Sequence, residues 1–183
     1  LGMGVGYVEA DFDMFGADYR RRGRTIEELI PFLRRAWTGE PFEFRGKTMQ
    51  VTPRPFTQPH PVLMLGGSSK VAVRRAARFG LPYLPPARLP ELEAYYYEQC
   101  AEYGTQGFCA MPPENTAMTH VAEDPDRVWR DLGHHFLEEA ATYSSWQPEG
   151  QTSSVHSHAT TVEELRSEGI YEVVTPAELV DRL

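Results

Sequence analysis

The chain has 183 residues, of which 41% are hydrophobic and 24% charged, a composition that can bury a core of ordinary size. Its formal net charge of −8 argues against a nucleic-acid or anionic-membrane partner, because either would require a basic face. No run approaches the ~20 apolar residues of a membrane span and no cleavable signal is evident, so we expect a cytoplasmic protein.

Cysteine and histidine usage indicates no metal or redox site. Cys100 and Cys109 fit neither a zinc spacing nor a Cys-x-x-Cys pair and are expected to be buried thiols. His156 and His158 lie in a polar, Ser-rich stretch with no third ligand evident. No metal is therefore predicted.

The first predicted elements are a short strand over Leu1–Val5 and a long helix. Thr25 and Glu28 have the spacing of a capping box at the start of the helix, and Gly39 is expected to stop it. The apolar positions at three-and-four spacing form one buried stripe: Ile26, Leu29, Ile30, Leu33, Ala36 and Trp37. Residues 40–61 then form a Pro-rich insertion, in which we expect a hairpin of 42–44 against 48–51, turned at 45–47.

The next segment has the architecture of a phosphate site. Val62–Leu65 are four apolar residues that suit a strand covered on both faces. Gly66 and Gly67 lack the Cβ atoms that would keep a ligand off the backbone. Ser68 or Ser69 can cap the following helix, whose free N–H groups and positive dipole end favour an anion. Similar glycine turns also join strands to helices where no ligand binds.

The second half of the chain continues the alternation. Short strands are predicted over 81–84 and 117–121, and a helix over Pro90–Tyr103 ending at Gly104. Asp124-Pro125 opens a long helix. Its expected buried stripe consists of Val128, Leu132, Phe136, Ala140 and Tyr143.

The last segments are a loop and two helices. Residues 147–160 are polar and are predicted to form a flexible loop or lid. A short helix follows from Val162, and Thr175-Pro-Ala-Glu178 reads as a capped helix start. His134 and His135 are adjacent on the long helix, about 100° apart, so at most one is expected to face a pocket.

Strands separated by helices imply an α/β fold of parallel β–α units. A (β/α)8 barrel needs about 250 residues and eight strands, whereas a doubly wound sheet needs fewer. We count four credible strands, and the chain starts on a strand and stops inside a helix. We therefore expect it to be a section of a longer protein.

Five segments carry a resemblance that extends over the chain, closely up to residue 80 and more loosely beyond it. They are LGMGVGY at 1–7, RGRTIEELIPFLRRAWTGEP at 22–41, FRG at 44–46, PVLMLGGSS at 61–69 and RAARFG at 75–80. In this order they resemble the luciferase-like monooxygenase family. Members are flavin- or deazaflavin-dependent oxidoreductases built on a TIM (β/α)8 barrel.

The resemblance implies that residues 1–183 form a single partial barrel domain, corresponding to about strands four to seven. It implies an oxidoreductase or monooxygenase that acts on a small organic substrate with FMN or the deazaflavin coenzyme F-420. This chain would supply the side of the site that holds the cofactor phosphate. The residues at matching positions are Gly66, Gly67, Ser68 and Ser69, with Gly4, Gly6 and Tyr7.

The resemblance has departures and leaves alternatives open. Leu81-Pro82-Tyr83 stands where the family often has an Asp-Gly-Trp-like segment, and Tyr7 where Trp is common. No acid or base is assigned: Glu123, Asp124 and His135 would border the barrel mouth, but charged residues at helix starts are usually caps. The alternatives are a non-catalytic flavin-binding protein of the same fold and an inactive fragment. Exposed strand edges would also permit a homo-oligomer.

Overall fold

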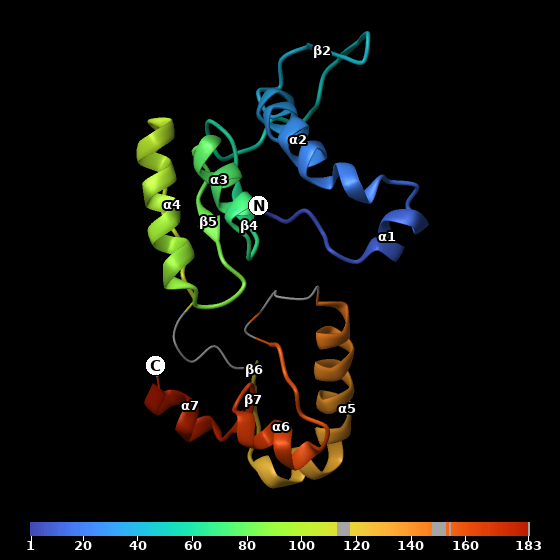
Figure 1. Ribbon diagram of the computed structural model, residues 1–183, viewed down its shortest axis with the longest axis vertical. Coiled ribbons are helices and arrows are strands. Elements are labelled where there is room, and N and C mark those ends of the chain that lie inside the picture. The colour runs from blue at the N-terminus through green and yellow to red at the C-terminus, as the bar shows by residue number, and fades with distance from the viewer. Residues whose placement is uncertain (113–117, 148–152, 154, 183) are drawn as a thin grey trace. The chain divides into compact units, whose positions relative to one another are not determined.

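The computed structural model describes residues 1–112, 118–147, 153 and 155–182 (Figure 1). The chain divides into two compact units. Unit 1 comprises Leu1–Leu84 and Glu91–Ala110, and unit 2 comprises Pro85–Pro90 and Met111–Leu183. In both, helices lie between the strands that pair in parallel, as the sequence predicts.

Unit 1 is built around a three-stranded parallel sheet with the order β1-β4-β5. Its elements are β1 (Gly2–Met3), α1 (Glu9–Met14), the 3-10 helix η1 (Tyr19–Arg21), α2 (Arg22–Ala36), β2 (Phe42–Phe44), β3 (Lys47–Met49), β4 (Met64–Gly66), α3 (Lys70–Arg78), β5 (Tyr83–Leu84) and α4 (Pro90–Tyr103). Met3 pairs with Leu65, and Leu65 pairs in turn with Tyr83. A single parallel bridge from Tyr83 to Cys109 continues the ladder.

The expected strand over 62–65 is only partly correct. Leu63 and Leu65 are buried, but 57% of Val62 is exposed. Val62 precedes β4, and its carbonyl accepts a hydrogen bond of 2.7 Å from the amino group of Leu1. The predicted cover on both faces therefore holds for the centre of the strand and fails at its start.

The predicted capping box at the start of α2 is wrong. The helix begins at Arg22, directly after η1, so Thr25 already lies inside it. The Thr25 hydroxyl donates to the carbonyl of Arg21 at 3.1 Å, and Glu28 pairs with Arg24 at 2.9 Å. Because η1 winds the chain one turn earlier, the capping role passes to Asp18, which accepts from the Arg20 N–H.

The predicted hairpin is present, but its second strand is Lys47–Met49 instead of 48–51, so the turn is one residue shorter than expected. Phe42 pairs with Met49 and Phe44 with Lys47. Arg45 and Gly46 form the turn, with φ values of 51° and 72°. Two consecutive left-handed residues are typical of the turns that match the twist of antiparallel strands.

Unit 2 contains a parallel pair, β6 with β7, connected through helices. Its elements are β6 (Met118–Val121), α5 (Pro125–Trp146), α6 (Val162–Glu168), β7 (Tyr171–Val174) and α7 (Pro176–Arg182). Helices α5 and α6 pack on each other and on β7. The core consists of Trp129, Phe136, Ala140, Leu165 and Tyr171.

The predicted stripe of α5 is wrong at Leu132, whereas Val128 is partly buried against the core. Leu132 is 44% exposed, and the buried positions there are Trp129 and Gly133. The stripe is shifted because Gly133 gives α6 a close approach: a Cβ atom at Gly133 would lie 2.6 Å from Cγ1 of Val162.

Part of the predicted 147–160 loop, residues 148–152 and 154, lies outside the described residues. Ser157 is only 6% exposed. Its hydroxyl donates to Glu168 at 2.6 Å, and its N–H donates to the hydroxyl of Ser144 at 3.1 Å. The flexibility of this loop stays a prediction. No helix in the described part of the chain is long and apolar enough to cross a membrane.

Candidate functional site

Two of the predicted site segments leave the same edge of the unit 1 sheet. Strand β1 runs into Gly4, Gly6 and Tyr7, and β4 runs into the loop of residues 66–69. Because β1 and β4 are parallel neighbours, their carboxyl ends share one edge. Ligands of open α/β sheets bind outside the carboxyl ends of the strands.

The 66–69 loop leads directly into the N-terminus of α3. Ser69 is the N-cap, and its Oγ accepts a hydrogen bond of 3.3 Å from the N–H of Ala72. The N–H groups of Lys70 and Val71 belong to the first turn and have no acceptor within the helix. No acidic residue lies in that turn, so the positive end of the helix dipole is not offset there.

The two loop glycines have packing roles of their own. A Cβ atom at Gly66 would lie 3.3 Å from the carbonyl oxygen of Leu84. Gly67 has φ +148°, and a Cβ atom there would lie 2.6 Å from Cβ of Ala72. The close contact of strand and helix therefore requires Gly67 whether or not a ligand binds.

The two glycines after β1 differ in the space that a side chain would find there. A Cβ atom at Gly4 would meet nothing within 4 Å, so the backbone is open there. Gly6 has φ +76°, and a Cβ atom would lie 3.0 Å from the ring of Phe12. Tyr7 is half-buried. Gly4 is thus the position on this side where the backbone is accessible to a ligand.

Tyr83 is a residue of this region that the sequence did not reveal. Its side chain is fully buried, and its hydroxyl donates a hydrogen bond to the carbonyl oxygen of Gly67. Its ring stacks on Tyr96 of α4, with 5.8 Å between centroids. Burial, reinforced by Cys109 and Glu91, raises the pKa of Tyr83. The only sequence signal was the departure from the family pattern at 81–83.

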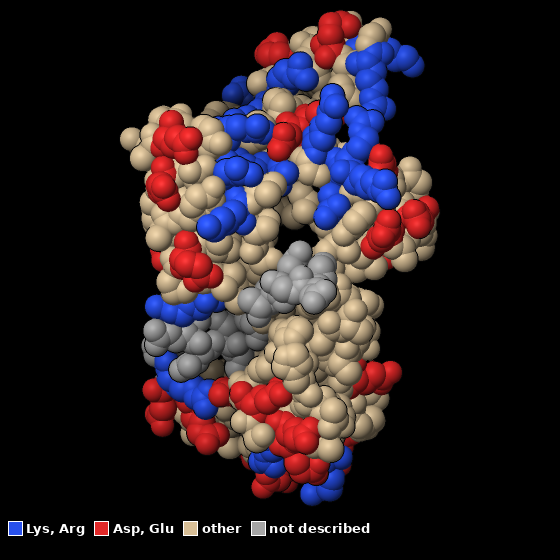
Figure 2. All heavy atoms as spheres, viewed as in Figure 1, with Lys and Arg blue, Asp and Glu red and all other residues tan. Residues whose placement is uncertain are grey.

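Basic residues gather on unit 1. This unit holds 13 of the 18 basic residues and 12 of the 26 acidic ones, so the acidic excess of the chain lies in unit 2. Figure 2 shows Lys and Arg side chains clustered over the region of α2 and α3. Two of them form ion pairs with Glu27, Arg75 at 2.9 Å and Arg78 at 2.7 Å. Because unit 1 itself is not acidic, the negative net charge of the whole chain does not argue against an anion bound there.

The candidate acid or base near the start of α5, Asp124, has a structural role, and the adjacent histidines of this helix have separate surroundings. Asp124 is the N-cap, accepting from the N–H of Arg127 at 2.9 Å. The rings of His134 and His135 lie 3.9 Å apart between centroids, yet they line two different clefts. The expectation that at most one of them faces a pocket is wrong, because the two surfaces of α5 are each hollowed.

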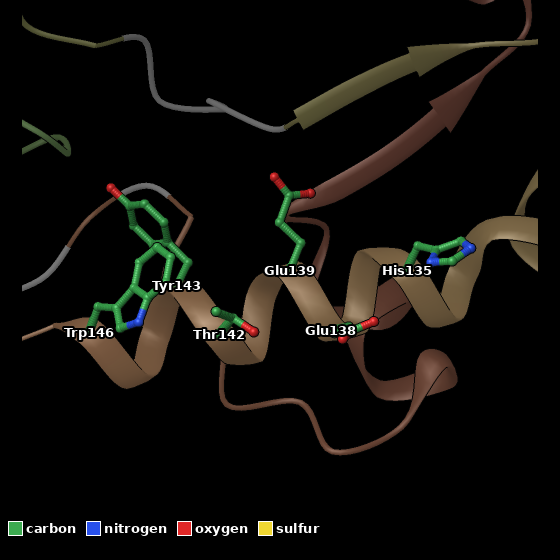
Figure 3. A pocket seen from close by; sticks show the side chains of 6 residues that line it. All are labelled: His135, Glu138, Glu139, Thr142, Tyr143 and Trp146. Atoms are coloured by element: carbon green, nitrogen blue, oxygen red, sulfur yellow. The ribbon is translucent and has the colours of Figure 1, made fainter.

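The cleft beside His135 has a volume of about 430 Å³ and is lined from α5 alone. Figure 3 shows Tyr143 and Trp146 together at one end of it, with Glu138 and Glu139 pointing to different sides of the helix. Glu139 hydrogen-bonds Tyr171, whose pKa burial and this carboxylate raise to about 12. Glu139 is thus hydrogen-bonded to a residue of the unit 2 core.

The cysteines are unpaired. Cys100 is buried and Cys109 half-buried. Burial, with a contribution from Glu93, raises the pKa of Cys109 to about 11, which disfavours the nucleophilic thiolate at neutral pH. Among the described residues, no three His, Cys, Asp or Glu side chains are grouped to hold a metal ion.

Parallel strands joined by helices make this an α/β protein. Comparison with known sequences then assigns it: the model of the luciferase-like monooxygenase family matches residues 1–183, and the chain belongs to that family. The resemblance seen in the sequence is thereby confirmed.

Similar proteins include uncharacterised proteins of Mycobacterium tuberculosis and Mycobacterium bovis, each 40% identical over 83 residues, covering 43% of this chain and 28% of the relative. An FMNH2-dependent dimethylsulfone monooxygenase of Pseudomonas putida is 32% identical over 81 residues, covering 40% of this chain and 22% of the relative. The matched regions therefore span less than a third of these relatives.

Among solved structures, the crystal structure of the monooxygenase RslO1 from Streptomyces bottropensis is similar, with a TM-score of 0.56 and 19% identity. The likeness covers 79% of this chain and 47% of that one, and it concerns the fold.

Proposed function

We propose that this chain supplies the phosphate-holding side of a cofactor site in a flavin-dependent oxidoreductase that acts on a small organic substrate. Family membership supports the general class. The observation that carries the proposal is the shared sheet edge, where the 66–69 loop, the N-terminus of α3 and the open backbone at Gly4 follow two adjacent parallel strands.

The donors at this edge suit a phosphate monoester. The amides of Lys70 and Val71 point out of the first turn of α3, and Ser69 has a hydroxyl hydrogen in addition to its capping lone pair. Such donors bind an anion through charge-assisted hydrogen bonds. Their role is to fix the orientation of the cofactor, whose ring, when bound, supplies the redox chemistry of the reaction.

We further propose that the fold is a partial (β/α)8 barrel. The parallel β/α units and the likeness to RslO1 support this, although the described residues form three separate sheets and no closed one. FMN is favoured over coenzyme F-420 by the name of the Pseudomonas putida relative. FMN is therefore the first cofactor to test.

The test compares FMN with riboflavin, since these ligands differ only in the phosphate. We expect the chain to bind FMN more tightly. Ser69→Asp should remove that preference, because Asp still caps a helix but places a negative charge where the phosphate would bind. Ser167→Ala is the control, since that exposed hydroxyl donates to the carbonyl of Glu164 within α6.

Two results would count against the proposal. One is equal affinity of the unaltered chain for FMN and riboflavin. The other is a Ser69→Asp variant that keeps the full preference for FMN. A double change of Ser68 and Ser69 to Ala extends the same test, and unchanged FMN affinity there would remove the site assignment.

A further inference from the structure

We propose that Tyr83 is a positioning residue for the 66–69 loop, setting the direction of the Ser68 N–H toward a phosphate group. The inference rests on the proposed function, because it concerns the same loop. The observation behind it is the hydrogen bond from the Tyr83 hydroxyl to the carbonyl oxygen of Gly67.

Holding this one oxygen orients a whole peptide unit. The Gly67 carbonyl and the Ser68 N–H belong to the same planar trans peptide, in which the C=O and N–H bonds point in opposite directions. When Tyr83 holds the carbonyl oxygen, the Ser68 N–H is directed to the opposite side of the loop. A rotated peptide would present a carbonyl oxygen there and repel an anion.

The loop needs such a restraint because of its glycine. Gly67 has φ +148°, a conformation that L side chains rarely adopt. Glycine offers no side chain through which packing could fix the neighbouring peptide. A hydrogen bond from a rigid partner supplies the restraint instead.

Tyr83 is itself held firmly. It is fully buried, and its ring stacks on the ring of Tyr96. The main chain of Tyr83 makes two hydrogen bonds: its N–H donates to the carbonyl of Phe108 at 3.0 Å, and its carbonyl accepts from the N–H of Ala110 at 2.8 Å. Since burial raises its pKa, the phenol stays protonated and remains a donor at physiological pH.

The experiment pairs Tyr83→Phe with Tyr96→Phe in the full 183-residue chain. Each variant keeps its ring and loses one buried hydroxyl bonded to a main-chain carbonyl, so both should melt at similar temperatures. Dissociation constants for FMN and riboflavin are then measured for both. We expect Tyr83→Phe to reduce the FMN-to-riboflavin preference by roughly fivefold, the value of one hydrogen bond, and Tyr96→Phe to leave it unchanged.

The outcomes separate this inference from the proposed function. A preference that Ser69→Asp abolishes and Tyr83→Phe preserves overturns the role of Tyr83 alone. An equal loss in the two Tyr variants, or an equal loss of FMN and riboflavin affinity, makes Tyr83 merely structural and also overturns it. No preference in the unaltered chain overturns both.

A second measurement needs no variant. Added inorganic phosphate should shift the amide NMR signal of Ser68 and leave that of Val73, whose N–H donates to the Ser69 carbonyl at 3.1 Å. A Ser68 signal that does not respond, while the Lys70 signal does, overturns the inference.

Discussion

The guanidinium of Arg75 on α3 occupies the space that a side chain at Gly23 on α2 would need: a Cβ atom at Gly23 would lie 2.6 Å from Nη2 of Arg75. Arg75 is only 9% exposed and bonds Glu27 through Nε at 2.9 Å. The contact joins the helix after β4 to the helix before the hairpin. A side chain at Gly23 would therefore require the guanidinium end of Arg75 to shift.

Gly23→Ala should therefore destabilise the protein, although alanine is the better helix former. We expect the free energy of unfolding to fall by about 1 kcal/mol, because the new methyl group displaces Arg75 from Glu27. Urea unfolding measures the change. With Arg75→Ala already present, Gly23→Ala should instead raise the free energy by about 0.5–1 kcal/mol. A loss of the same size in both backgrounds would contradict the steric explanation.

Glu27 should make the stability of unit 1 depend on pH. Burial opposes its ionisation, but hydrogen bonds and charges from Arg78 and Arg75 outweigh burial and lower its pKa below the usual 4.5. A carboxyl whose pKa is lower in the folded state stabilises the fold above its unfolded pKa, and this stabilisation is lost as the pH falls through the folded value.

We therefore expect Glu27→Gln to lower the free energy of unfolding by about 1 kcal/mol at neutral pH, with the difference from the unaltered chain vanishing below the lowered pKa. Urea unfolding at several pH values measures this. The control is Glu28→Gln, whose partner Arg24 is 73% exposed and which should cost no more than about 0.5 kcal/mol. A Glu27 effect that persists in acid would point to lost packing instead of lost charge.

Helices whose ends are marked by local chemistry could be predicted from the sequence. The helix α4 has the predicted bounds, Pro90 to Tyr103, and Gly104 after it adopts φ +64°. The capping box at Thr175 is present, since its hydroxyl accepts from the N–H of Glu178 at 3.2 Å. These signals depend on neighbours in the sequence, which is why they could be read directly.

Features set by tertiary contacts could not be predicted in the same way. The strand β7 is not among the predicted elements: Tyr171, Val173 and Val174 favour a strand, but the stretch is only four residues long, and its partner β6 is separated from it by two helices. For the candidate site, the strand, glycines and serines of the 66–69 loop indicated a phosphate site. The Tyr83 contact to Gly67 spans 16 residues and depends on the pairing of Leu65 with Tyr83, which no local pattern encodes.

Gly133 is expected to be a position in unit 2 where a larger side chain destabilises the fold. A Cβ atom there would lie 2.6 Å from Cγ1 of Val162 and 3.4 Å from Cε3 of Trp129. We expect Gly133→Ala to lower the free energy of unfolding by about 1–3 kcal/mol through overpacking. Thermal or urea unfolding measures it. Val162→Ala should recover part of the loss in the double variant, and strictly additive losses would show that the two positions do not compete for space.

Asp124 is expected to act as a helix cap and not as an acid or base. Its Oδ1 accepts from the N–H of Arg127 at 2.9 Å, and Pro125 follows at the first position of the helix. Asp124→Ala should lower the free energy of unfolding by about 1 kcal/mol, whereas Asp124→Ser, which can make the same bond, should stay close to the unaltered chain. Circular dichroism during urea unfolding measures both variants. Equal losses in the Ser and Ala variants would show that the carboxylate itself, and not its capping bond, is what position 124 requires.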